Sequence, residues 1–348
     1  MKDIRIGKHS IGSGNPTYVI AEAGGNHNGS LETAKKLIEV AAEAEADAVK
    51  FQVFRAHRVY PRSAGMSDYL QMSRSIYEVI AELEMPWEWL PQLAEHCEKA
   101  SITFLASVFD DESADRLDPY VAAFKIASYE MTHWPLIRHT AAKKKPLIVS
   151  TGAAELSEVR EMVQEVRNCG SADIALMQCT ASYPAPLTSL NILAIETMKR
   201  EFGVPVGLSD HSRDPIVGPM AAVALGADLI EKHFTLSNRL PGPDHAFAVE
   251  PEELKLMVRR IREVQSVRGN PAKVVDPVES DLRHFARRSI FTTRQVTAGE
   301  KLTPENVAVL RCGKLVAGLA PRDFERVLGK RAVRDIPAEQ PLTDADLA

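Results

Sequence analysis

The sequence predicts an α/β protein, a (β/α)8 barrel (TIM barrel) followed by a small β-rich domain. The first observation is that short apolar runs alternate eight times with amphipathic segments before residue 268. Apolar strands joined by helices indicate a parallel sheet covered on both faces, and eight such units favour a closed barrel. The second observation is that this alternation stops after residue 268, where short β runs punctuated by Gly and Pro follow.

An open, doubly wound sheet is the alternative arrangement of the same elements. Such a sheet, when it binds a dinucleotide, carries a GxGxxG turn directly after its first strand. The sequence has no such turn, and the Gly-Ser-Gly around Ser13 precedes the first predicted strand. The barrel is therefore the preferred prediction.

The first strand and helix show how each element is assigned. Residues 18–22 form a β-branched run, Ser30 can cap a helix, and residues 31–46 place apolar side chains at helical spacing. The strands are predicted at 18–22, 48–53, 102–107, 122–127, 146–150, 173–179, 204–209 and 228–233. The helices are predicted at 31–46, 75–84 (within a long loop from 55 to 84), 86–100, 112–117, 128–143, 156–168, 189–202, 214–225 and 251–267.

The domain boundary is predicted from the change in composition. Residues 1–268 form the barrel, residues 269–284 a linker, and residues 285–348 the small β-rich domain. A domain of about 60 residues is near the lower limit for folding alone. We therefore expect it to pack on the barrel or on a second subunit.

Composition limits the function classes. The chain has 348 residues, a net charge of −5 and a pI near 6.1, which argue against a surface that coats nucleic acid. Four cysteines without a CxxC pair indicate neither a zinc ribbon nor a disulfide framework. No secretory h-region and no long apolar run occur. We expect a cytoplasmic enzyme with no membrane partner.

Two histidines form a candidate metal site. His211 and His233 end consecutive predicted strands, so a barrel places their imidazoles side by side at one rim. Asp210, Glu231 and Asp244 are carboxylates close by in the sequence. Imidazole with carboxylate suits Mn, Fe, Co or Zn. The alternative is that both histidines are hydrogen-bonded structural groups.

Two lysines lie inside apolar strands. Lys50 and Lys125 interrupt the runs AVKFQV and AFKIAS, and a buried ammonium is costly without an anionic partner. Together with the Ser150 and Ser209 hydroxyls, they suit a phosphate or carboxylate ligand. Neutralisation by a glutamate of the neighbouring strands is the structural alternative.

The motifs in order resemble those of one enzyme family. The chain resembles the nonulosonate (sialic acid) synthases in the segments AEAGGNHNGS, VKFQ, KIASYE, STG, CTASYP, GLSDHS, ALGADLIEKHF and PGPDH. Its C-terminal segments RRSI, TAGEKLTPEN and VLGKRAVRDI resemble the SAF (antifreeze-like) domain of those enzymes. The resemblance covers essentially the whole chain and implies the barrel followed by this domain.

The resemblance implies condensation of phosphoenolpyruvate with an acylated amino-hexose, which gives a nine-carbon 2-keto acid and phosphate. It implies that His211 and His233 hold a divalent metal, Mn²⁺ first, with Mg²⁺ or Co²⁺ as alternatives. Glu22 and Glu231 are the implied acid–base and orienting groups. The implied substrate-binding residues are Lys50, Gln52, Lys125, Ser128, Ser150, Tyr183, Ser209, Asp244 and Arg311.

The resemblance also implies a domain-swapped homodimer, in which Arg311 reaches the sugar's N-acyl group in the partner subunit's site. The chain departs from the family pattern at Ala181 and at Cys312, which follows Arg311 in place of the proline of the usual Arg-Pro. N-acetylmannosamine and a 2,4-diacetamido-2,4,6-trideoxyhexose are therefore both candidate substrates.

Three alternatives stay open. One is another metal-dependent barrel synthase of spore-coat or surface polysaccharide, and a second is an aldolase or epimerase using Lys125 as a Schiff base. The third is a carbohydrate- or ice-binding protein acting through its C-terminal domain. That domain lacks the repeated threonine face expected of an ice binder.

Overall fold

The structure is a computed structural model that describes residues 2–66, 74–170 and 173–348. The chain divides into two compact units, residues 1–269 and 270–348. Each unit is described by itself. The middle of the long loop predicted at 55–84, residues 67–73, lies outside the described residues.

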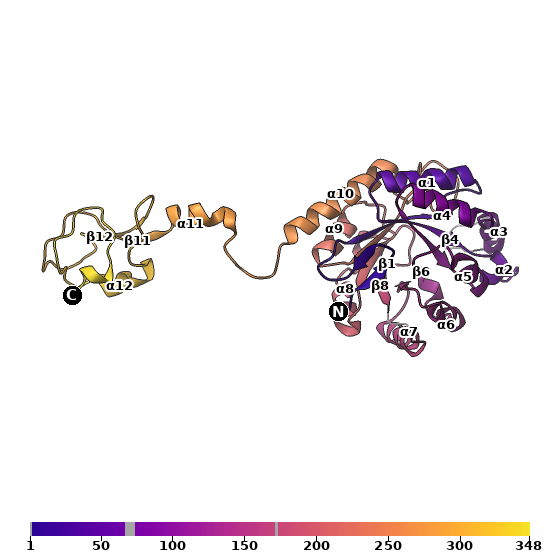
Figure 1. Ribbon diagram of the computed structural model, residues 1–348, viewed down its shortest axis with the longest axis horizontal. Coiled ribbons are helices and arrows are strands. Elements are labelled where there is room, and N and C mark those ends of the chain that lie inside the picture. Colours follow the sequence, from indigo (N-terminus) through magenta and orange to yellow (C-terminus); the bar gives the residue numbers. More distant parts are fainter. Residues whose placement is uncertain (1, 67–73, 171–172) are drawn as a thin grey trace. The chain divides into compact units, whose positions relative to one another are not determined.

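The first unit is a closed parallel barrel, as predicted (Figure 1). Its strands follow one another in the order β10-β3-β4-β5-β6-β7-β8-β9, and each pairs in parallel with its neighbours. The barrel strands are β3 (Tyr18–Gly24), β4 (Ala48–Val53), β5 (Thr103–Val108), β6 (Phe124–Ile126), β7 (Leu147–Ser150), β8 (Ile174–Cys179), β9 (Val206–Asp210) and β10 (Leu229–His233).

Helices follow most strands and bury one apolar face against the barrel. Ser30 caps the first of them by accepting a hydrogen bond from Thr33 N at 3.2 Å, as its position predicted. The helices are α1 (Leu31–Glu43), α2 (Ala56–Val59), α3 (Ile76–Glu82), α4 (Trp89–Lys99), α5 (Asp111–Leu117), α6 (Trp134–Ala142), α7 (Leu156–Asn168), α8 (Ala194–Phe202), α9 (Val217–Ala224) and α10 (Pro251–Arg268).

The predicted helix at 214–225 starts later than expected. Asp214 Oδ1 accepts hydrogen bonds from the backbone N–H groups of Ile216 and Val217, both at 2.7 Å. These bonds hold a turn just before the helix, and α9 begins at Val217 with Ile216 at its N-cap position. Residues 211–216 form a loop at the end of β9.

An antiparallel hairpin precedes the barrel and was not predicted. It consists of β1 (Ile4–Ile6) and β2 (His9–Ile11), each three residues long. Its isoleucines are buried in one cluster with Tyr18 and Leu105, near the starts of barrel strands. The hairpin therefore belongs to the apolar end of the barrel, opposite the end where the strands finish in polar residues.

The second unit has a small core of its own. Two strands, β11 (Arg288–Thr292) and β12 (Val307–Arg311), pair antiparallel, and the buried residues around them include Ile290 and Val327. The other predicted β runs form isolated bridges, such as Val296 with Ile336. A short helical stretch, η3 (Pro277–Glu279) and α11 (Ser280–Ala286), begins in the segment predicted as a linker and ends two residues beyond it.

Candidate active site

The site residues predicted in the barrel lie at the carboxyl ends of its strands. Glu22 lies two residues before the end of β3, and the sheet register places it beside Lys50 on β4 and beside His233 on β10. Alternate residues of a strand share one face, so Glu231 and His233 of β10 point the same way. These side chains are at most 7% exposed. One rim thus brings the predicted lysines, carboxylates and histidines together.

The two lysines are neutralised by two glutamates. Lys50 Nζ lies 2.6 Å from Glu22 Oε2 and 3.7 Å from Glu231 Oε1. Lys125 Nζ lies 3.9 Å from Glu231 Oε1 and donates to Ser150 Oγ at 2.6 Å. The structural alternative is therefore found, because each lysine has a carboxylate partner. Each lysine also contacts a serine hydroxyl, and its role in binding an anionic ligand stays a prediction.

Burial and neighbouring charges shift the pKa values of Lys50, Lys125 and Glu231. Burial works against the Lys50 ammonium, but Glu22 and Glu231 outweigh it and raise the pKa of Lys50. Burial lowers the pKa of Lys125, with Glu231 partly offsetting the effect. Burial opposes ionisation of Glu231 as well, yet the two lysines hold the pKa of Glu231 below its usual range. The rim carries paired charges.

Some buried carboxylate oxygens at this rim make no hydrogen bond within the described residues. Within the described residues, Glu231 Oε2 and Glu130 Oε2 are buried without a hydrogen bond. Burial raises the pKa of Glu130 to about 7. Unsatisfied buried groups are rare in native proteins and call for an explanation such as a ligand, an ion or water. Their position beside the lysines marks this rim as a place where a polar ligand fits.

The two predicted metal ligands face each other. The rings of His211 and His233 lie edge to face with their centroids 5.3 Å apart. His211 Nδ1 lies 2.9 Å from the carbonyl oxygen of Thr180, so the Nδ1–H donates there and Nε2 keeps its lone pair. His233 Nδ1 lies 3.4 Å from Asp244 Oδ2. Burial, with His233 close by, lowers the pKa of His211 to about 3.

This pair fits a metal that keeps open coordination positions. A metal-binding imidazole normally donates its other N–H to a carbonyl or carboxylate, and each ring here has such a neighbour. In the described parts of the chain, no cluster of three or more His, Cys, Asp or Glu side chains is arranged as a metal site. Two imidazoles would thus supply part of the coordination, and substrate or water the rest.

Aromatic rings enclose the histidines. Tyr183 stacks on His211 with ring centroids 4.3 Å apart, and Phe247 lies 5.1 Å from His233. Tyr183 and Phe247 also touch each other, with centroids 5.6 Å apart. Burial raises the pKa of Tyr183, so its hydroxyl stays protonated. The histidine side of the rim has apolar walls and a phenol, a setting that suits a sugar.

A glycine lets three site residues approach one another. Gly24 has φ +53, and a Cβ at this position would lie 2.9 Å from Asp244 Oδ2 and 3.5 Å from Gln52 Nε2. Gln52 donates to Glu22 Oε1 at 3.0 Å. Only glycine combines this backbone conformation with that space. The predicted residues Gln52 and Asp244 are therefore close to Glu22.

The remaining predicted side chains are placed as follows. Ser209 donates to Glu231 Oε1 at 3.0 Å. Ser128 Oγ accepts from Gly152 N at 3.0 Å and donates to Cys179 Sγ at 3.5 Å. Both serines lie among the lysines and histidines of the rim.

Arg311 belongs to the second unit, which is described by itself. It ends β12 in the second unit, and its side chain is exposed. Cys312, the departure from the family pattern, is buried and donates to Ser289 Oγ at 3.3 Å. The cysteine thus belongs to the core of the small unit, while Arg311 points away from it. A role for Arg311 at a partner's site stays a prediction.

Sequence reasoning missed two residues of this region. Ser107 accepts a hydrogen bond from Lys50 Nζ at 2.9 Å. Lys232 is buried between Glu231 and His233 in the sequence and pairs with Asp210. The argument that singled out Lys50, a lysine within an apolar strand, applies to Lys232 as well. For Ser107 the available signal was its place one residue before the end of β5.

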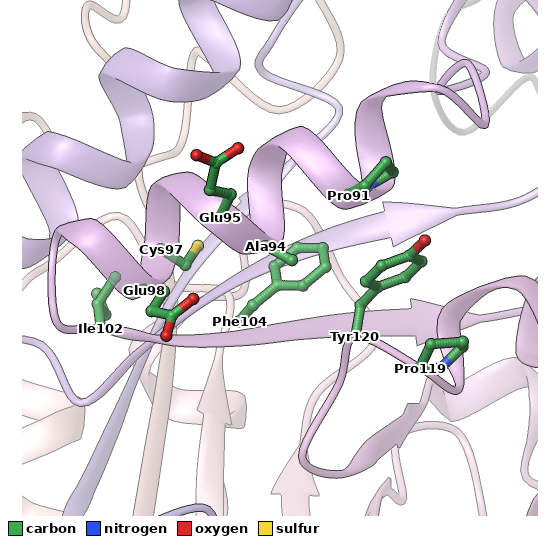
Figure 2. Close-up of a pocket in the computed structure, with 9 residues that line it drawn as sticks. All are labelled: Pro91, Ala94, Glu95, Cys97, Glu98, Ile102, Phe104, Pro119 and Tyr120. Atoms are coloured by element: carbon green, nitrogen blue, oxygen red, sulfur yellow. The ribbon is translucent and has the colours of Figure 1, made fainter.

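The surface pocket drawn in Figure 2 lies elsewhere. It is formed by α4, β5 and the turn after α5, on the outside of the barrel. Its lining residues are Pro91, Ala94, Glu95, Cys97, Glu98, Ile102, Phe104, Pro119 and Tyr120. None of them is a predicted site residue, and the lining carries no cation for an anionic substrate. The candidate site is therefore defined by the polar side chains at the carboxyl ends of the strands and not by this surface pocket.

The fold and the site together define a (β/α)8-barrel enzyme type, with buried lysines on one side of the rim and two histidines on the other. The model of the NeuB family matches residues 37–273, and that of the SAF domain matches residues 287–348. The chain therefore belongs to the NeuB family.

Relatives cover nearly the whole chain. Spore coat polysaccharide biosynthesis protein SpsE of Bacillus subtilis is 43% identical over 356 residues, which cover 97% of this chain and 95% of that protein. N,N'-diacetyllegionaminic acid synthase of Legionella pneumophila is 38% identical over 336 residues, covering 94% and 93%. The crystal structure of N-acetylneuraminic acid (sialic acid) synthetase from Leptospira borgpetersenii gives a TM-score of 0.75 at 31% identity, covering 81% and 95%.

None of the helices in the described part of the chain is long and apolar enough to cross a bilayer.

Proposed function

We propose that this protein is a nonulosonate synthase that condenses phosphoenolpyruvate with an N-acylated amino-hexose. The observation that carries the proposal is the meeting, at one barrel rim, of Lys50 and Lys125 with His211 and His233. Relatives with the same span are named as synthases of legionaminic and pseudaminic acid. The candidate hexoses are N-acetylmannosamine and a 2,4-diacetamido-2,4,6-trideoxyhexose.

The side of the rim that carries Lys50 and Lys125 would bind phosphoenolpyruvate. Lys50 and Lys125 offer ammonium groups, and Ser150 and Ser209 offer hydroxyls within hydrogen-bond distance of Lys125 and Glu231. Charged donors form strong hydrogen bonds to phosphate and carboxylate. An incoming phosphate competes with Glu22 and Glu231 for the lysines, which frees carboxylate oxygens next to the reacting carbon.

The histidine side would bind the sugar aldehyde. His211 and His233 would hold a divalent metal, Mn²⁺ first, with Mg²⁺ or Co²⁺ as alternatives. When bound there, such a metal supplies polarisation of the aldehyde oxygen. Tyr183 and Asp244, which neighbour the two histidines, would contact the sugar.

Glu22 and Glu231 would orient and deprotonate the water that adds to the substrate. C3 of phosphoenolpyruvate forms the new bond to the aldehyde carbon, and C2 becomes electron-deficient. Water adds at C2 and loses a proton to Glu22, with Glu231 orienting the groups. Phosphate then leaves with its bridging oxygen as the hydroxyl at C2 loses its proton and becomes a ketone. One of the two protons of the water ends on the aldehyde oxygen, which becomes a hydroxyl, and the other leaves with the phosphate, so one water is consumed per turnover. Atoms balance as one keto acid and one phosphate per turnover.

The second unit would complete the site from another subunit. In a domain-swapped homodimer, Arg311 would reach the N-acyl group of the sugar in the partner's barrel. The exposure of the Arg311 side chain agrees with this role. Four free cysteines agree with a reducing compartment such as the cytoplasm.

Phosphate release tests the proposal. The purified protein is given phosphoenolpyruvate and Mn²⁺ with N-acetylmannosamine, a 2,4-diacetamido-2,4,6-trideoxyhexose, or mannose. The expected result is phosphate and keto acid in equal amounts with one acylated sugar, little with mannose, and loss with a chelator. Phosphate formed without any sugar, or a borohydride-trapped adduct on Lys125, would replace this proposal with hydrolysis or Schiff-base chemistry.

A further inference from the structure

Lys232 is buried on the opposite face of β10 from Glu231 and His233. Only 1% of its side chain is exposed. Its ammonium lies 2.7 Å from Asp210 Oδ2, 2.5 Å from the carbonyl oxygen of Ser212, 3.2 Å from Ser212 Oγ and 2.8 Å from the carbonyl oxygen of Asp214. All four contacts fall on one short segment. One side chain therefore holds both flanks of His211.

The segment after β9 is tightly built around this ammonium. Asp210 Oδ1 accepts from Ser212 N at 2.8 Å, so the Asp210 carboxylate bridges Lys232 and the backbone beyond His211. A Cβ on Gly218 of α9 would lie 2.9 Å from Asp210 Oδ2, which shows how closely the helix approaches.

His211 itself is tied on its inner side. Its carbonyl oxygen accepts from Ala185 N at 3.0 Å, and its Nδ1 contacts the carbonyl oxygen of Thr180 at 2.9 Å. The Thr180 contact orients the ring, and the Ala185 bond holds the backbone on this side. Lys232 and Asp210 hold the same backbone on its opposite side.

We propose that Lys232 is a positioning residue for His211. It fixes the 210–214 segment so that the imidazole meets His233 with Nε2 free, and this inference rests on the metal-binding role in the proposed function. A buried ion pair alone is weak evidence of stability, because its desolvation cost is large. Groups behind a metal ligand commonly change metal affinity by 10–100-fold when mutated.

The test uses two matched double variants. Lys232→Met/Asp210→Asn removes the pair without leaving a buried charge alone. Lys199→Met/Asp228→Asn removes a second Lys–Asp pair, in which Lys199 Nζ of α8 lies 2.6 Å from Asp228 Oδ2 and the side chains are 20% and 5% exposed. Asp228 accepts from Val206 N, so this pair lies near the amino end of β9, away from His211. Both changes replace an ion pair anchored to β9, but only the first touches the His211 segment. The single variant Lys232→Met is added for comparison of folding.

Two measurements are made on each full-length protein. Hydrogen exchange of the peptide spanning 207–217, without metal, is expected to be about tenfold faster in the Lys232 double variant and unchanged in the control. The dissociation constant for Mn²⁺, measured by titration calorimetry, is expected to rise by about 10–100-fold in that variant only. Saturating Mn²⁺ is expected to restore part of the turnover.

The outcomes separate the two claims. A Lys232 variant with wild-type exchange, or with faster exchange but wild-type Mn²⁺ affinity, overturns the positioning role. A control variant that loses Mn²⁺ equally also overturns it, because the effect is then general loss of stability. If the wild-type protein binds no Mn²⁺, the metal part of the proposed function fails, and the exchange rates alone decide whether Lys232 holds the segment.

Discussion

Replacement of Lys50 by Met tests the ion pairs that Lys50 forms with Glu22 and Glu231 at the rim. The ammonium lies 2.6 Å from Glu22 Oε2, and the two side chains are 3% and 1% exposed. Without this ammonium, Glu22 keeps the hydrogen bond from Gln52, and Glu231 keeps its ion pair with Lys125. Removing one partner of a buried ion pair costs about 3–5 kcal/mol. Urea unfolding at pH 7 should show a loss of this size, together with loss of phosphate release.

The double variant Lys50→Met/Glu22→Gln separates stability from function. It removes both charges, so most of the stability should return, because a buried pair replaced as a whole is often nearly neutral. Phosphate release should stay lost, since a cation for the substrate is gone. Lys36→Met is the control, because its ion pair with Glu39 is 54% and 42% exposed and its loss should not move the midpoint. A stable, active Lys50→Met protein would refute the reasoning.

Three further predictions follow from single residues. His233→Ala should abolish Mn²⁺ binding in titration calorimetry, and unchanged binding would contradict the metal assignment. Gly24→Ala should cost about 1–3 kcal/mol in urea unfolding, because φ is +53 and the new Cβ meets Asp244, and should slow turnover. Burial lowers the pKa of His27 to about 4, so His27 must stay neutral in the folded state. Between pH 6.5 and 4 the wild-type protein should lose about 3 kcal/mol more stability than His27→Asn; equal pH profiles would contradict this.

The barrel was predictable because its strands repeat one pattern. Apolar runs alternate with helical segments, and in most strands a polar residue such as Glu22 or Ser150 lies at or near the carboxyl end. Parallel strands align those ends at one rim, so the residues that meet could be named in advance. The lysine contacts with Ser150 and Glu231 follow from that alignment.

Other features leave weaker traces in the sequence. The strands of the first hairpin are three residues long, too short for an alternating pattern to stand out, and they are stabilised by contacts with Tyr18 and Leu105. Lys232 stands between Glu231 and His233, which were assigned to the site. Its own position, as a lysine inside an apolar strand, was not used in the prediction. Which carboxylate pairs with which lysine depends on side-chain conformations, to which the sequence pattern gives no direct clue.

The central claim is that the rim has an anion-binding half and a metal-binding half. Titration calorimetry of phosphoenolpyruvate into the wild-type protein, Lys125→Met and His233→Ala tests it most directly. Loss of a charged hydrogen bond to the ligand should weaken binding about tenfold or more in Lys125→Met. His233→Ala should bind phosphoenolpyruvate almost as the wild type does. Equal weakening in both variants, or none in Lys125→Met, would contradict the division of the site.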